Sequence, residues 1–103
     1  MIRGTTPELK FGVPFDPTTC KQIWITFSQN NREIFTIYKE DCTLTSTEIM
    51  VKLSQIQTLS LSSAYQVQIQ VRATFPGTPQ DSALASDIIT TSVGKLLREG
   101  VIE

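Results

Sequence analysis

Few side chains in this sequence could do chemistry, because histidine is absent and the acidic residues are scattered. Acyl-transfer catalysis needs a nucleophile beside a base, so a lysine or a carboxylate would have to replace histidine. None of the many serines lies in a Gly-x-Ser-x-Gly elbow. Glycosidase chemistry needs two carboxylates across a cleft, but the candidate acids lie at expected turns and strand ends, where acids are normally solvated: Glu33, Glu40, Asp41 and Glu48. The sequence therefore predicts no enzyme and no catalytic residue.

Metal and cofactor chemistry is not indicated either. Cys20 and Cys42 are too few and too far apart for a metal site, and the five glycines stand singly, without a phosphate-binding loop. The first residues include no apolar segment typical of a secretory signal, so we expect synthesis in a reducing cytosol. Two free thiols follow from this, and a disulfide between two loops is the alternative.

Three features could form a binding surface. The first is a polar row on one strand, Gln66, Gln68 and Gln70 followed by Arg72; it is either a solvated sheet face or an uncharged surface for a partner or a second copy. The second is the pair Trp24 and Tyr38, which alternation places opposite the main core. These rings fill a sandwich edge, or they mark an interface hot spot or a platform for sugars. The third is the apolar chain ends, which dock on a neighbour or on the domain itself: Ile2, Leu96, Leu97, Val101 and Ile102.

The elements that must position these residues are strands, because apolar residues alternate with polar ones at a period of two. Asn30-Asn31 predicts a tight hairpin, and Ser54 could cap one helical turn. Residues 75 to 82 are typical of a loop, and the last predicted strand runs from about 83 to 93. We expect an all-β fold: an antiparallel β-sandwich, immunoglobulin-like in architecture, of six to seven strands with at most one or two helical turns. The predicted core comprises Phe11, Ile25, Phe27, Ile37, Val51, Leu53, Val67, Ile69 and Val71.

Length and charge limit the classes of partner. The 103 residues suffice for a single domain, with short flexible or docking ends at about 1–6 and 95–103. Nine basic and ten acidic residues give a net charge of −1, which disfavours nucleic acid. No apolar run approaches the roughly 20 residues that span a bilayer, so no membrane partner is expected. We expect self-association through a sheet edge or a polar sheet face, because the strand of Gln66, Gln68 and Gln70 carries no charge before Arg72.

Four stretches resemble a family of small proteins encoded near tail and baseplate genes in phages and prophages of Firmicutes. They are residues 1–7 (MIRGTTP), 13–16 (VPFD), 23–29 (IWITFSQ) and 83–94 (ALASDIITTSVG). The chain also resembles the immunoglobulin-like N-terminal domains of phage baseplate proteins. The resemblance implies a virion structural or tail-assembly role, with other tail proteins or further copies as partners. It implies a location in the host cytoplasm during assembly, and in the virion if the protein is incorporated. The alternatives are a carbohydrate-binding module for host adsorption and an assembly chaperone released before maturation.

Overall fold

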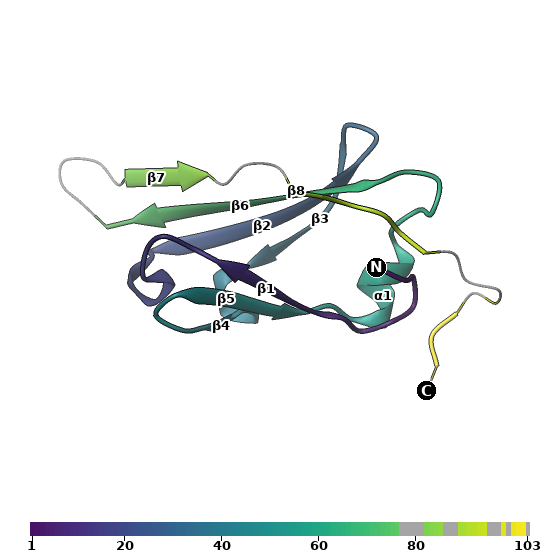
Figure 1. Cartoon of the computed structure of the whole chain (residues 1–103), viewed down its shortest axis with the longest axis horizontal. Coiled ribbons are helices and arrows are strands. Elements are labelled where there is room, and N and C mark those ends of the chain that lie inside the picture. The colour runs from purple at the N-terminus through teal and green to yellow at the C-terminus, as the bar shows by residue number, and fades with distance from the viewer. Residues whose placement is uncertain (77–81, 86–88, 95–97, 99, 103) are drawn as a thin grey trace.

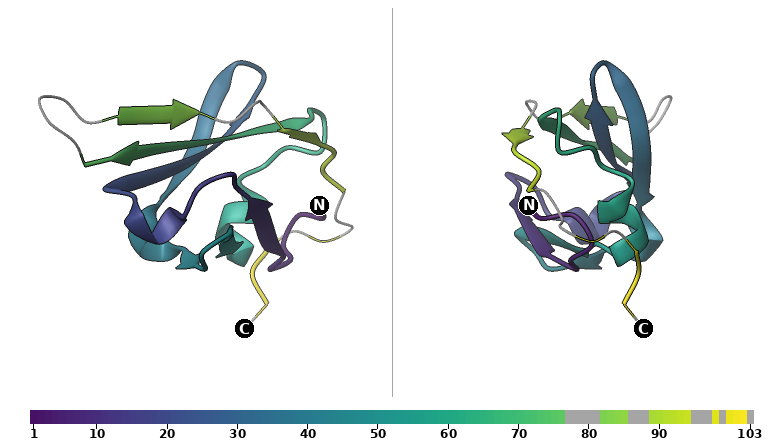
Figure 2. Two further views of the ribbon diagram at one scale, coloured as in Figure 1. Left: turned by 60° about the vertical axis from the view of Figure 1, so that its left-hand side comes forward. Right: turned by 90° about the vertical axis from the view of Figure 1, so that its right-hand side faces the viewer.

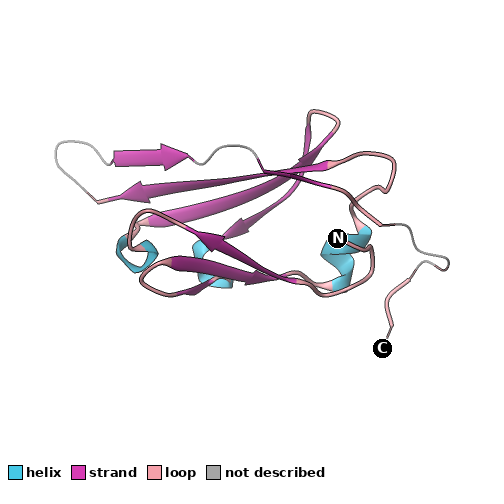
Figure 3. Cartoon of the chain, in the orientation of Figure 1, coloured by secondary structure: helices cyan, strands magenta, loops and turns pink. Residues whose placement is uncertain are grey.

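A computed structural model describes residues 1–76, 82–85, 89–94, 98 and 100–102 of the chain. Nearly all regular structure in this part is β, with one short helix and two 3₁₀ turns (Figure 3). The strands are β1 (Glu8–Gly12), β2 (Gln22–Gln29), β3 (Arg32–Tyr38), β4 (Thr43–Leu44), β5 (Glu48–Lys52), β6 (Val67–Phe75), β7 (Ser82–Ala85) and β8 (Ile89–Thr91). The helix is α1 (Gln55–Leu59), and the 3₁₀ turns are η1 (Pro17–Thr19) and η2 (Lys39–Asp41).

The strands form two antiparallel sheets, which confirms the predicted all-β fold (Figure 1). The smaller sheet has the order β1-β5-β4. The larger has the order β3-β2-β6, and β6 pairs with both β7 and β8 on its other side. The views in Figure 2 show the sheets as two layers. The described residues contain eight strands where six to seven were expected, because the segment predicted as one strand from 83 to 93 holds β7 and β8, and the turn after β3 holds β4.

The position of β6 corrects one expectation about association. This strand carries Gln68 and Gln70, and it lies between β2 and the pair β7 and β8, so its backbone groups are used inside the sheet. An interior strand cannot pair with a further chain. Of the two routes predicted for self-association through this strand, only the one through its side-chain face is open.

The core lies between the sheets and is built by the alternation seen in the sequence. All nine predicted core residues are buried, from Phe11 at 9% exposed to Phe27 at 0%. Ile23, Ile49 and Leu61 join the same cluster. Alternation in the sequence also predicts that Tyr65 points to the same side as Val67, and this prediction is wrong. Tyr65 is 50% exposed because it precedes β6 and does not follow the alternation of that strand.

The predicted turn and cap are both present. Asn30 and Asn31 have φ values of 50° and 61°, as a two-residue hairpin between β2 and β3 requires. Ser54 caps α1 in a capping box: its side chain accepts a hydrogen bond from the Gln57 amide, and the Gln57 side chain accepts one from the Ser54 amide, at 3.1 and 2.9 Å.

Polar anchors tie the connections to the sheets. Gln29, at the end of β2, is only 4% exposed, and its amide group makes three hydrogen bonds to the loop before β6. Arg3 donates to the carbonyls of Leu59 and Leu61 at 2.7 and 2.6 Å, and so joins the first residues of the chain to α1.

The described parts of both chain ends are hydrogen-bonded to the domain through their backbone, although the side chains of Ile2, Val101 and Ile102 are 53%, 48% and 81% exposed. Ile2 forms a parallel bridge with Gly94, and the Met1 amino group donates to the Ser92 carbonyl at 3.1 Å. Near the other end, the Gln55 side chain exchanges two hydrogen bonds with the backbone of Ile102. The expectations for Leu96 and Leu97 lie outside the described residues.

Candidate functional site

The solvent side of the larger sheet carries a regular array of side chains, which we call the outer face. Strands β3, β2 and β6 each contribute three residues, and the register places them in three rows across the sheet. The rows are Tyr38–Trp24–Arg72, Thr36–Thr26–Gln70 and Glu33–Ser28–Gln68. Because side chains alternate along a strand, the same strands give their other side chains to the core.

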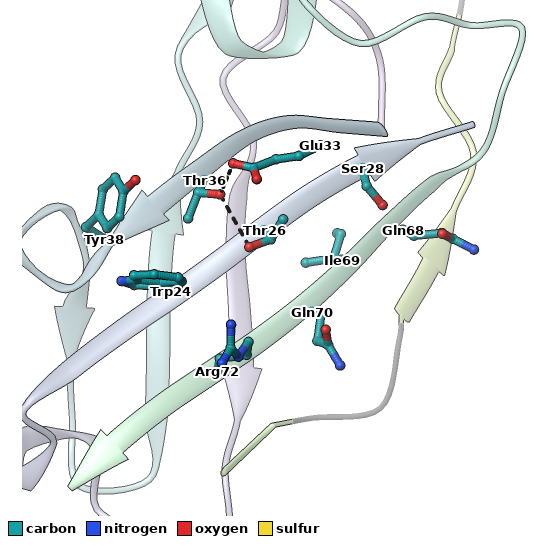
Figure 4. A pocket seen from close by; sticks show the side chains of 10 residues that line it. All are labelled: Trp24, Thr26, Ser28, Glu33, Thr36, Tyr38, Gln68, Ile69, Gln70 and Arg72. Carbon is teal, nitrogen blue, oxygen red and sulfur yellow. Dashed lines mark hydrogen bonds between the residues drawn. The ribbon is translucent and has the colours of Figure 1, made fainter. Parts of the chain in front are cut away.

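A hollow of about 470 Å³ lies over this array (Figure 4). All nine residues of the outer face line it, together with Ile69. Its volume falls within the roughly 300–1,000 Å³ typical of ligand sites. The side chains come from three paired strands, so their positions are fixed by the sheet and not by a loop.

A β-bulge decides which residue of β3 reaches the outer face at the hairpin end. The register between β2 and β3 shifts after Phe27: this residue faces Phe35, but Ser28 faces Glu33, so Ile34 is the extra residue. Strict alternation from Thr36 would put Ile34 on the outer face. The bulge instead lets Ile34 pack against the core and brings Glu33 beside Thr36.

Aromatic side chains occupy the first row. Trp24 and Tyr38 are 44% and 43% exposed, with ring centroids 6.1 Å apart and planes at 89°. The Arg72 guanidinium lies 5.6 Å from the centroid of the Trp24 ring, a cation–π distance. In Figure 4 the Tyr38 ring is seen face-on and the Trp24 ring edge-on. Trp24 therefore contacts both Arg72 and Tyr38, and all three side chains line the hollow.

A chain of oxygen atoms crosses the second and third rows. The Thr36 hydroxyl donates to the Glu33 carboxylate at 2.6 Å, and the hydroxyls of Thr36 and Thr26 lie 3.3 Å apart (Figure 4). A hydroxyl has one proton, so Thr36, which gives its proton to Glu33, must accept from Thr26. The free hydrogen-bonding capacity of this chain is therefore acceptor capacity.

The structure brings together four of the five predicted binding residues. Trp24, Tyr38, Gln68 and Gln70 all line the hollow, whereas Gln66 lies before β6 and does not. Sequence reasoning missed the threonines, Ser28 and Glu33. Alternation around Trp24 could have found Thr26 and Ser28, but Glu33 reaches the site only through the bulge.

The other candidate groups do not form a site. Of the four acids considered for catalysis, only Glu33 lines the hollow. Both cysteines are free: Cys20 is buried, and the half-buried Cys42 donates from Sγ to the Tyr38 carbonyl at 3.3 Å. Burial raises the pKa of the Cys20 thiol. Burial, with Asp41 and Glu40 nearby, raises the pKa of Cys42 to about 11, so neither group is activated as a thiolate.

Two further features are absent from the part of the chain that the structure describes. No group of three or more cysteine or acidic side chains is placed to hold a metal ion there. No helix among the same residues has the length and apolar character needed to cross a membrane. Comparison of the chain with protein-family models, with curated proteins and with solved structures gives no match.

Proposed function

We propose that this chain is a non-enzymatic protein of a phage tail or baseplate, and that it works by binding another protein through its outer face. The observation that carries the proposal is the pair of exposed aromatic rings, Trp24 and Tyr38, fixed at one end of a hollow on a rigid sheet. Aromatic and arginine side chains at a partly enclosed position are typical anchors of protein interfaces. Trp24, Tyr38 and Arg72 form such a row.

The resemblance of the four sequence stretches to tail-associated proteins supports the choice of partner. One of these stretches, residues 23–29, is most of β2, the central strand of the outer face. In this proposal the protein is made in the host cytoplasm, binds tail proteins or further copies of itself there, and enters the virion if it stays bound.

Site-specific photocrosslinking in infected or induced cells tests this function. A benzophenone amino acid at Thr26, in the middle of the outer face, should crosslink to a tail or baseplate protein that mass spectrometry identifies. The same amino acid at Lys52, exposed on the other sheet, is the matched control. Equal crosslinking from both positions, or no tail protein among the products, contradicts the proposal. Mass spectrometry of purified particles then separates a virion component from a released chaperone.

A second candidate function is carbohydrate binding during host adsorption. The observation that favours it is the concavity of the outer face. A flat protein partner would leave a void over a hollow of about 470 Å³, whereas a small ligand or a protruding group could fill it.

A further inference from the structure

We propose that the hollow binds a neutral sugar, with one face of the sugar ring on Tyr38, its edge against Trp24, and its hydroxyl groups donating to Glu33 and Thr26. This inference rests on the second candidate function and makes it specific. It follows from which hydrogen-bonding groups the hollow offers and which it lacks.

The part of the hollow around Glu33, Thr36 and Thr26 offers hydrogen-bond acceptors. Thr36 uses its only proton on Glu33, and Thr26 uses its proton on Thr36. What remains is lone pairs: those on Thr26 Oγ1 and those on the Glu33 carboxylate. A ligand that lies here must bring O–H or N–H groups, and a polyol brings several in a small volume.

At the end formed by Tyr38 and Trp24 the hollow is lined by aromatic rings, so a ligand needs an apolar surface there. Tyr38 lines the hollow and is 43% exposed, and the planes of the Tyr38 and Trp24 rings lie at 89°. A pyranose has one face formed by C–H groups, which can lie on an aromatic ring, and a rim of hydroxyls. The two requirements, apolar face and donor rim, are met together by this class of ligand.

Charge in the hollow is balanced and does not favour an ionic ligand. Arg72 and Glu33 lie in opposite corners of the array, and the guanidinium is already placed at 5.6 Å from the Trp24 ring. The amides of Gln68 and Gln70 line the side between them and can both donate and accept. An acidic sugar bound in the proposed orientation would place its carboxylate near that of Glu33, where the two negative charges repel each other.

The dimensions of the array allow an extended ligand. Strands are roughly 4.8 Å apart and alternate residues on a strand roughly 6.8 Å apart, so three rows on three strands span about 10 by 14 Å. The sheet holds these groups in place before binding, and a site that is already ordered loses less entropy when the ligand binds.

The single tryptophan gives a direct assay, because Trp24 is the only one in the chain and lines the hollow. The purified protein is titrated with short oligosaccharides of glucose, galactose, mannose and N-acetylglucosamine, and with sialylated and sulfated glycans. Tryptophan emission and amide chemical shifts are followed. We expect at least one neutral sugar to bind, with shifts concentrated on β2, β3 and β6, and weaker binding of the anionic glycans.

Two matched pairs of variants locate the site. Tyr38→Ala should weaken binding about tenfold, as expected for one lost aromatic contact. Tyr65→Ala removes a ring outside the hollow that is 50% exposed, against 43% for Tyr38, and should leave affinity unchanged. Glu33→Gln should weaken binding several-fold and Glu40→Gln should not. Amide spectra of all four variants check that each is folded.

Three results overturn the inference: no neutral sugar changes emission or shifts at millimolar concentration, the anionic glycans bind more tightly, or the two members of each variant pair behave alike. Crosslinking of the outer face to a tail protein in the absence of sugar binding would leave the assembly role intact and overturn the sugar inference alone. Sugar binding without such crosslinks would reject the assembly role alone.

Discussion

The buried amide of Gln29 is expected to be one of the larger single contributors to stability outside the apolar core. Its side chain donates to the carbonyls of Ser62 and Tyr65 at 2.7 and 3.0 Å and accepts from the Ser62 amide at 2.8 Å. A net 0.5–1.5 kcal/mol for each bond gives about 1.5–4.5 kcal/mol for the three. Ser62 is half-buried and Tyr65 exposed, so water can replace part of what is lost in Gln29→Ala. We expect a loss of about 2–3 kcal/mol in the free energy of unfolding.

Urea unfolding followed by circular dichroism measures this change. With an m-value of about 1–2 kcal/mol/M, a loss of about 2 kcal/mol lowers the midpoint by about 1–2 M. Gln66→Ala is the control, because Gln66 is an exposed glutamine directly before β6. Its free energy of unfolding should stay within about 0.5 kcal/mol of that of the native protein. Hydrogen exchange at the Ser62 amide should accelerate in Gln29→Ala before global unfolding does. Equal midpoints for the two variants would refute the argument that this side chain holds the loop.

Three further predictions concern other parts of the fold. Ile69→Ala should cost about 2–5 kcal/mol and lower the melting temperature clearly, while Gln68→Ala on the opposite face should barely change it; equal effects would show that the inward and outward assignment is wrong. Ser54→Ala removes the N-cap of α1 and should cost about 1 kcal/mol in denaturant unfolding, whereas no loss would mean that the capping box contributes nothing. The pKa of the Cys42 thiol is raised from 9.0 to about 11, so the unfolded chain ionises first, and the free energy of unfolding should fall between about pH 9 and pH 11. Cys42→Ala should show a smaller fall over that window, and an identical pH profile for the two proteins would contradict the shift.

Much of the fold could be predicted from the sequence because alternation records which side of a strand is buried. From Ile23 to Phe27 on β2 and from Val67 to Phe75 on β6 every second residue is apolar, and this pattern predicts both the core and the outward direction of Trp24 and Gln68. The pattern cannot say which strands are neighbours, since pairing depends on contacts between distant segments. The interior position of β6 therefore had to come from the structure.

The site was predicted only in part for a related reason. Gln66 was assigned to the polar row because it continues the spacing of Gln68 and Gln70, but β6 begins one residue later, at Val67. Glu33 is exposed, as expected for an acid near the hairpin, but its place on the outer face depends on the bulge. A period of two carries no information about an inserted residue, although the neighbouring apolar pair Ile34 and Phe35 marks the place where alternation fails.

The bulge in β3 also has an evolutionary consequence. One-residue deletions inside strands are usually lost to selection, because they turn every later side chain to the wrong face. In β3 the extra residue is already accommodated, so deleting one residue next to Ile34 would restore regular pairing with β2 and leave the register from Phe35 to Tyr38 unchanged. Deletion of Ile34 would leave Glu33 on the outer face opposite Ser28, whereas deletion of Glu33 would put Ile34 there and replace an acid with an aliphatic group. Length variation between residues 32 and 35 is thus a single-step route by which related chains could exchange one ligand preference for another while keeping the same sheet.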